Sequence, residues 1–452
     1  MNKSPSWFVL SLILASLPAL RADDEIATTA DQLRLTGKYE EAVEQYAKLS
    51  ETDVVRAAIG LARYELARGQ IEEAKKRLAD VLAKHASDAR LLAELAAIAF
   101  QQGDHAAARK HVDAAIKQDE NQLLARWYDA ELRRVTGQMD EANVGYRWFV
   151  RYYNRHQREI TDAEGIRYIG LAAAQYARWN RNSSQFSFLV NTLFPKAMRL
   201  NEKYWPANLE SARLFMEKYN EADALTDLNA ALAINPNSAE IHVARAQFAL
   251  QKFDLTTAKS SLERALQINP KSIDALHLRA DLLAANFRLG EAADVLEDAR
   301  KLNPVHQETL GRLAAIYGAT DGLDMDAQGD DDADSRMGAI IGQAVDRNKH
   351  CGTFFFTLAS TLEGLRKFPY AAKYYQQAQE RMPQLVEVSG RLGLMHMRLG
   401  EEGQGAKLLN ESFEIDPFNV RVKNMLAVLD VLKNYAVIET EHFVIKFDRF
   451  VA

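Results

Sequence analysis

Small and bulky apolar residues recur along the chain at a fixed interval, which is the spacing between Pro236, Pro270 and Pro304. The small positions are Ala224, Ala258 and Ala292, then Ala231, Ala265 and Ala299, and the bulky position is Leu228, Leu262 and Leu296. Two helices of about a dozen residues with two short turns fill such an interval. Small residues let the two helices of a hairpin approach closely, and the leucine fills the gap to the next hairpin. The pattern predicts a row of stacked helical hairpins.

The residues expected to end these helices repeat as well. Each proline follows an Asn and should end the second helix of a hairpin, because proline cannot continue the hydrogen-bond ladder and biases its predecessor away from helical geometry. Pro383 and Pro417 are separated by the same interval. Upstream, Gly69, Gly103 and Gly137 repeat it again, and Gly37 precedes Gly69 by a slightly shorter spacing. We expect these glycines to end helices in a left-handed backbone conformation.

This combination resembles the tetratricopeptide repeat family. The resemblance implies an all-α fold, a right-handed solenoid of antiparallel helical hairpins with a concave inner face. About ten or eleven repeats would span residues 23–435. The irregular regions would be residues 126–205 and a loop at 321–335.

The amino terminus predicts export. Lys3 precedes an apolar stretch from Trp7 to Leu17, and a small residue, Ala22, ends a plausible cleavage site. This stretch is too short to cross a bilayer comfortably, and no second long apolar run follows it. We therefore expect residues 1–22 to be a signal peptide cleaved after Ala22, and the protein to be periplasmic or secreted with no transmembrane span. A retained anchor is the alternative.

Composition narrows the possible partners. The formal net charge is −6, which argues against general binding of polyanions such as nucleic acid. The irregular region at 126–205 nevertheless holds four tryptophans, and ten arginines fall within its first part, residues 126–181. Arginine interleaved with aromatic residues can bind nucleic acid, or it can simply pack on aromatic faces in an irregular repeat. We expect packing, and the partner to be a protein or peptide.

An acidic stretch interrupts one repeat. Residues 321–334 contain seven aspartates and predict an inserted loop between the two helices of that repeat. The start Asp324-Met325-Asp326 resembles an EF-hand calcium loop, but Ser335 stands where the bidentate Glu is required. A solvated loop is therefore the preferred interpretation, with calcium binding as the alternative.

The sequence carries no catalytic signature. There is no His-Glu-x-x-His, no phosphate-binding loop and no Gly-x-Ser-x-Gly. The lone cysteine, Cys351, follows His350, and adjacent residues on a helix point about 100° apart, so a structural or capping role is preferred over metal binding. We expect no enzyme activity, no cofactor and no metal.

The carboxyl end changes period. Residues 436–448 are β-branched and aromatic, with Phe443, Ile445 and Phe447 alternating as in a strand. This predicts a single strand-like segment with no strand to pair with, the stub of a missing or separate domain at 436–452. Several segments are similar to exported bacterial proteins in which a tetratricopeptide array precedes a gluzincin-type zinc metallopeptidase domain: Asn348–Phe355, Arg391–Glu402, Asp416–Val422 and Glu439–Asp448.

Two functions follow from these patterns. One is a non-catalytic exported scaffold that binds a protein or peptide partner on its concave face. The alternative is the substrate-presenting or regulatory arm of a secreted gluzincin-type peptidase whose catalytic domain lies beyond residue 452. In the repeat family, inner-face positions of the first helix follow a fixed phase. Carried onto this chain, that phase gives Arg213, Val243, Gln247, His277, Asp281, Asn286, Phe356 and Ser360.

Overall fold

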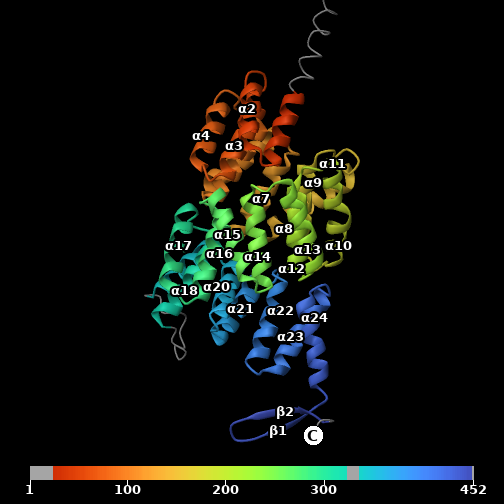
Figure 1. Ribbon diagram of the computed structural model, residues 1–452, viewed down its shortest axis with the longest axis vertical. Coiled ribbons are helices and arrows are strands. Elements are labelled where there is room, and N and C mark those ends of the chain that lie inside the picture. The colour runs from red at the N-terminus through yellow and green to blue at the C-terminus, as the bar shows by residue number, and fades with distance from the viewer. Residues whose placement is uncertain (1–23, 323–334, 450–452) are drawn as a thin grey trace, which may run out of the picture.

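The protein is an elongated α-solenoid that ends in a small β-hairpin (Figure 1). The computed structural model describes residues 24–322 and 335–449. Within these ranges the chain folds into antiparallel helical hairpins from the helix at 24–35 to α23, followed by α24 and the hairpin. The predicted all-α solenoid is confirmed. The predicted signal peptide lies outside the described residues.

First helices of successive hairpins contact one another, as α5 with α7 and α18 with α20, and form the inner layer. They are the helix at 24–35, α3 (Val54–Ala67), α5 (Ala89–Gln101), α7 (Leu123–Val135), α9 (Ala163–Trp179), α12 (Trp205–Glu217), α14 (Ala239–Gln251), α16 (Ile273–Ala285), α18 (Gln307–Asp321), α20 (Gly352–Gly364), α22 (Glu387–Arg398) and α24 (Val420–Leu432).

Second helices form the outer layer. They are α2 (Tyr39–Leu49), α4 (Ile71–Leu82), α6 (His105–Gln118), α8 (Met139–His156), the composite α10 (Ser184–Phe188), η1 (Leu189–Leu193) and α11 (Phe194–Leu200), α13 (Glu221–Ile234), α15 (Leu255–Ile268), α17 (Leu289–Leu302), α19 (Arg336–Arg347), α21 (Phe368–Arg381) and α23 (Glu402–Ile415).

The helix ends follow from the residues found there. Inner helices often begin at a residue whose side chain accepts a backbone N–H, as Asp53 does from Arg56 and Ser238 from Ile241. Outer helices α13, α15 and α17 end at an extended Asn directly before proline, as predicted. The glycines Gly37, Gly69, Gly103 and Gly137 all have positive φ, between 73° and 83°, which confirms their expected left-handed conformation.

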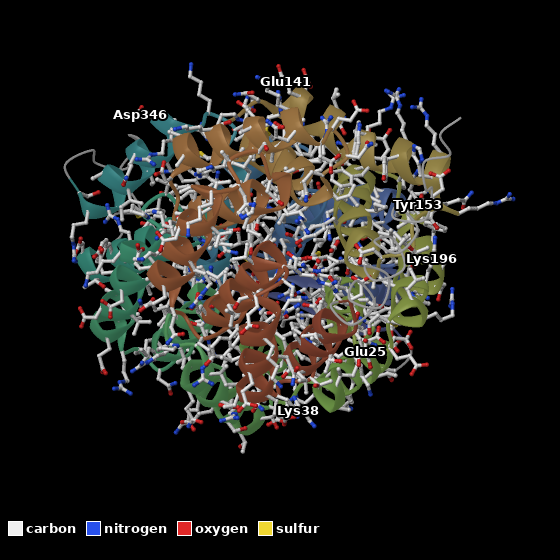
Figure 2. All side chains as sticks on the ribbon, turned by 90° about the horizontal axis from the view of Figure 1, so that it is seen from above. Glu25, Lys38, Glu141, Tyr153, Lys196 and Asp346 are labelled. Carbon is white, nitrogen blue, oxygen red and sulfur yellow. The ribbon has the colours of Figure 1, made fainter. Side chains whose placement is uncertain are left out.

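Successive turns of the superhelix touch each other, which the repeat pattern alone did not predict. The Asn269 side chain donates to the Leu66 carbonyl at 3.3 Å, and that of Asn303 donates to the Gln101 carbonyl at 3.0 Å. These partners are 203 and 202 residues apart, so one superhelical turn takes roughly six repeats. Figure 2 looks along the long axis, where the red and orange helices of the first turn lie over the green helices of the second.

The glycine turns are where the next superhelical turn docks. A Cβ atom on Gly69 would lie 2.5 Å from Asn269 Oδ1, and one on Gly137 would lie 2.7 Å from Asn348 Oδ1. Gly37 and Gly103 meet the Oδ1 atoms of Asn235 and Asn303 still more closely. Glycine is therefore needed twice over at these turns, for its backbone conformation and for the space that the Asn carboxamide occupies.

The irregular region has longer helices. The helices α8 and α9 have 18 and 17 residues, and a π-helical segment, η1, interrupts the outer helix that follows. All four tryptophans pack partly buried against the largest hydrophobic cluster. Arg126 stacks 4.9 Å from the centre of the Trp148 ring, and Lys196 lies 5.4 Å from the Tyr153 ring, where Figure 2 shows the two side chains together on the outer rim. These contacts support the packing interpretation of the aromatic and cationic residues.

The prediction of a lone carboxyl-terminal strand was wrong. Residues 436–448 contain most of two short strands, β1 (Tyr435–Glu439) and β2 (Val444–Asp448), which pair antiparallel with Ile438 opposite Ile445. A polar turn joins them, in which the Thr440 backbone N–H donates to the Phe443 carbonyl at 2.8 Å. The expected acidic loop, with its EF-hand-like start, follows α18 and precedes α19 in the sequence, and its residues 323–334 lie outside the described residues.

Candidate functional site: the inner face of the superhelix

Ion pairs between inner helices line the inner face of the superhelix. Arg63 on α3 contacts Glu94 on α5 at 2.5 Å and Glu164 on α9 at 2.8 Å. Further along, Arg167 pairs with Glu210 at 2.7 Å, and Arg312 pairs with Asp281 at 3.0 Å. The inner face is therefore polar, and these charges already have partners within the chain.

Burial and Arg63 act against each other on two carboxyl groups. Burial raises the pKa of Glu94, which is the more deeply buried of the two, in spite of its contact with Arg63. Burial opposes ionisation of Glu164 as well, but the charge of Arg63 and its two hydrogen bonds lower the pKa of Glu164. The shared guanidinium on α3 thus stabilises carboxylates on two other inner helices, α5 and α9.

The inner face of the first superhelical turn contains a cavity of about 370 Å³. Its walls include Asp31, Arg56, Arg90, Glu94, Asp162 and Tyr168. The arginines are paired here too, Arg56 with Asp31 at 3.1 Å and Arg90 with Asp88 at 2.8 Å. A ligand entering this cavity would have to compete with existing ion pairs, which makes it a weak candidate for binding.

A second cavity, of about 270 Å³, lies between α16, α18 and α20 and has a different character. The half-buried Phe356 ring lines it together with Ala284, Ala285 and Gly364. No atom lies within 4 Å of where a Cβ on Gly364 would be, so the space beside this glycine is open. Ser360 and the Asp281–Arg312 pair supply polar groups to the wall. The cavity therefore combines an aromatic surface with a few polar groups, as binding pockets for peptides commonly do.

A third cavity, of about 290 Å³, separates the two superhelical turns. Glu217 lies there, paired with Arg178 at 2.5 Å and with Lys218 at 2.9 Å. Burial alone would raise the pKa of Glu217, but the two cations outweigh it and lower the pKa to about 2. Lys218 also reaches Asp416 of the next turn at 2.6 Å. This cluster joins the turns, and we assign it a structural role.

The structure brings three of the predicted groove residues together. Asp281, Phe356 and Ser360 all line the cavity between α16, α18 and α20. Arg213 forms an ion pair with Glu210, whose nearer carboxylate oxygen is 3.3 Å away. Gln247 is partly exposed on α14, with no contact to that cavity.

The structure places three other predicted groove residues where their side chains have partners within the chain. Val243 is 2% exposed and packs in a hydrophobic cluster with Leu262 and Leu278, so its side chain does not face a groove. His277 is 4% exposed and its Nε2 lies 2.7 Å from Thr309 Oγ1. Asn286 is exposed, but its side chain donates to the Leu282 carbonyl at the end of α16. Val243 and His277 are buried because inner helices are covered on two sides, by the next inner helix and by their own outer helix.

Sequence reasoning missed several residues of the cavity. Gly364 follows Phe356 and Ser360 at steps of four, a helical spacing that would have found it. Arg312, the partner of Asp281, gave no such signal, because it does not occupy the repeat position of Asp281. Arg63, Glu94 and Glu164 were missed as well, since their contact spans three inner helices.

Three features of the described part of the chain bear on function: possible metal-ligand groups, the reactivity of Cys351 and the apolar length of the helices. Residues 24–322 and 335–449 contain no group of three His, Cys, Asp or Glu side chains placed to hold a metal ion. Cys351 stands just before α20, is 1% exposed, and burial raises the pKa of its thiol to about 11. In the same ranges, no helix has both the length and the apolar content needed to span a bilayer.

Two stretches of the chain match models of the tetratricopeptide repeat, residues 59–123 and residues 239–272. Over these two stretches the chain is similar to tetratricopeptide repeats. The second matched stretch is one full interval of the predicted pattern and begins at the first residue of α14. Repeats of this kind form extended concave surfaces that bind other proteins.

Two of the similar solved structures share less than a fifth of their residues with this chain. One similar structure is a chain of the APC/C hetero-tetramer Cut9–Hcn1, at 14% identity and a TM-score of 0.48, covering 88% of this chain and 68% of that chain. Another is PilF of Pseudomonas aeruginosa, at 17% identity and a TM-score of 0.29, covering 50% of this chain and 97% of that one. No curated protein matches the chain.

Proposed function

We propose that this protein is a non-catalytic, exported scaffold that binds an extended segment of a protein or peptide partner on its inner face. The observation that carries the proposal is the cavity between α16, α18 and α20, which presents the half-buried Phe356 ring beside small residues and open space. Of the cavities on the inner face, this is where a partner can bury apolar surface without displacing an ion pair.

The chemistry of the cavity suggests the kind of segment that binds. An aliphatic or aromatic side chain would pack on Phe356, against the small wall of Ala284, Ala285 and Gly364. Both carboxylate oxygens of Asp281 accept hydrogen bonds from Arg312, yet the side chain is 34% exposed, so a remaining lone pair can accept a further hydrogen bond from a partner. We therefore expect a segment with an apolar anchor residue next to a backbone N–H or a basic side chain.

Selection from a random peptide library tests this proposal, with the full chain immobilised and Phe356→Ala as the critical variant. Selected peptides should share an apolar anchor and bind Phe356→Ala about tenfold more weakly, because the anchor loses its aromatic surface. Phe188→Ala removes a partly exposed ring from the outer layer and should leave affinity unchanged. Peptides that bind both variants as tightly as the unmodified chain would disprove an inner-face site at Phe356.

Export is a separate part of the proposal. The charge and apolar pattern of residues 1–22 supports it. Mass determination of the protein purified from a bacterial periplasm should give a chain that begins at Asp23. A chain that keeps Lys3 and Arg21 and remains with the membrane would instead support a retained anchor.

A second candidate function is the arm of a secreted zinc metallopeptidase, and the β1–β2 hairpin favours it. Its residues Val437, Ile438, Phe443, Val444 and Ile445 are exposed apolar side chains on the two strands and the turn between them. A lone two-stranded sheet is marginal in water, so a further domain packed on it would stabilise it. An in-frame His-Glu-x-x-His downstream of codon 452 would support this candidate, whereas a stop codon there would leave the scaffold proposal alone.

A further inference from the structure

Two phenylalanines occupy strained and exposed positions on adjacent hairpins. Phe253 and Phe287 stand between the inner and outer helices of their hairpins, where Gly37, Gly69, Gly103 and Gly137 stand in earlier ones. Both have a left-handed backbone, with φ of 59° and 58°. Their side chains are 88% and 79% exposed. A left-handed Phe with a solvated ring costs stability and gains no visible packing, which is the pattern expected at a binding surface.

The same kind of turn is covered elsewhere in the molecule. Each of the four glycine turns has the Asn of a later turn against it, in three cases from an Asn-Pro pair. At another such turn the left-handed residue is Tyr219, and the turn Asp416-Pro417 with the start of α24 covers it. The left-handed residue between the inner and outer helices of a hairpin is thus where the next superhelical turn docks.

The Tyr219 turn shows how an aromatic residue is accommodated there. Lys218 binds the Asp416 carboxylate at 2.6 Å, and the Lys218 carbonyl accepts from the Val420 N–H at 3.3 Å. Arg421 lies 5.9 Å from the centre of the Tyr219 ring and donates to its hydroxyl at 3.4 Å. A carboxylate, an N–H group and an arginine from the covering turn therefore engage the Lys-Tyr pair.

The Phe253 turn repeats this arrangement without its cover. Lys252 precedes Phe253 as Lys218 precedes Tyr219, and Leu255 at the start of α15 is 61% exposed. Within residues 24–322 and 335–449, no turn of the chain lies over Phe253 or Phe287. Lys252 pairs with Glu221 of its own superhelical turn, and both side chains are about half exposed.

A second copy of this chain is a poor occupant. All four Asx-Pro turns, at Asn235, Asn269, Asn303 and Asp416, already lie against an earlier turn of the same chain. The sequence before residue 235 contains no Asx-Pro pair, so the uncovered end of the first superhelical turn cannot supply one. Stacking of copies would join surfaces that lack the matching residues.

We propose that the edge formed by Phe253 and Phe287 docks a different helical-repeat protein, through turns of the Asx-Pro type. A carboxylate from such a turn would bind Lys252, and an arginine from the helix that follows would stack on Phe253, as Asp416 and Arg421 do at Tyr219. This edge lies between inner and outer helices, so it is distinct from the inner-face cavity at Phe356.

The test uses the full chain and a folded helical-repeat probe in which one inter-hairpin turn carries Asp-Pro-Phe-Asn-Val-Arg, the sequence of residues 416–421. The probe should bind the unmodified chain, and the double variant Phe253→Gly, Phe287→Gly should bind it about tenfold more weakly. The same probe with Ser-Gly in place of Asp-Pro should bind weakly to both. Because glycine suits a left-handed turn, the double variant should melt no lower than the unmodified chain.

Several results would overturn the proposal. They are absence of probe binding, equal binding to the double variant, and a marked fall in its melting temperature, which would mean that the rings pack within the chain. Self-association in sedimentation equilibrium that the double variant abolishes would make a second copy the occupant instead. Phe356→Ala should leave probe binding unchanged. The docking edge at Phe253 and Phe287 and the inner-face site at Phe356 can therefore each be disproved independently of the other.

Discussion

The contact between superhelical turns can be tested with one methyl group. Gly137 and Gly400 both have left-handed backbones, with φ of 83° and 81°. A Cβ on Gly137 would lie 2.7 Å from Asn348 Oδ1, whereas a Cβ on Gly400 would meet nothing within 4 Å. Gly400→Ala is therefore a matched control that adds the same backbone strain without the clash.

The expected difference follows from these two environments. Alanine in the left-handed region costs about 1 kcal/mol, and that is the whole effect expected of Gly400→Ala. Gly137→Ala must also displace the Asn348 carboxamide, which is 4% exposed and donates to the Val135 carbonyl at 3.1 Å. A buried amide left without its partner costs about 1–3 kcal/mol more. We therefore expect a total of about 2–4 kcal/mol for Gly137→Ala.

Hydrogen exchange followed by mass spectrometry is the suitable assay, because a solenoid can open in segments and a single unfolding transition cannot be assumed. In Gly137→Ala, exchange should accelerate on both sides of the contact, in α7 and α8 and in residues 348–352. Each 1.4 kcal/mol corresponds to about tenfold in exchange rate. Acceleration confined to α7 and α8, or equal to the local effect of Gly400→Ala, would refute the coupling between turns.

Three further predictions concern buried polar groups. The pKa of Glu217 is lowered from 4.5 to about 2, so its ionisation contributes about 3 kcal/mol to folding stability, which is present above pH 4.5 and is lost as the pH falls toward 2. Glu217→Gln should therefore weaken the loss of stability at acid pH, and an unchanged dependence of stability on pH would contradict this. Arg63→Met leaves the buried Glu94 carboxylate without its cation and should lower the free energy of unfolding by about 3 kcal/mol in chemical denaturation. Adding Glu94→Gln should restore part of this loss, and no recovery would mean that Arg63 acts through packing alone. Cys351, whose pKa is raised to about 11 by burial, should react with a thiol reagent at pH 8 only after denaturation, and rapid reaction of the native chain would show that α20 opens readily.

Local features of the fold were predictable because they depend on nearby residues. The constant repeat interval, the Asn-Pro helix ends and the left-handed glycines each follow from steric rules that act within one hairpin. The docking of Asn269 on the turn at Gly69 was not predictable in this way. It depends on the small rotation between repeats, summed over roughly six of them, which no single interval encodes.

The candidate site was predictable only in part. Phe356, Ser360 and Asp281 fell on the inner-face phase and do share a cavity. Val243 and His277 fell on the same phase but are buried, because the exact face turned to the groove varies with local packing. The β-hairpin was mistaken for a single strand because its turn, Thr440–Phe443, lacks the Asn-Gly or Gly pair that usually signals a two-residue hairpin turn.

The chain is wound so tightly that turns about 200 residues apart touch. Spin labels at Gln70 and Lys271, both exposed and beside the contact of Gly69 with Asn269, measure this directly. Cys351 is first replaced by Ser so that the two labels are the only ones. A single narrow distribution at short distance is the result predicted. A broad distribution at long distance would mean an open superhelix, in which neither these contacts nor the covered turn at Tyr219 exists.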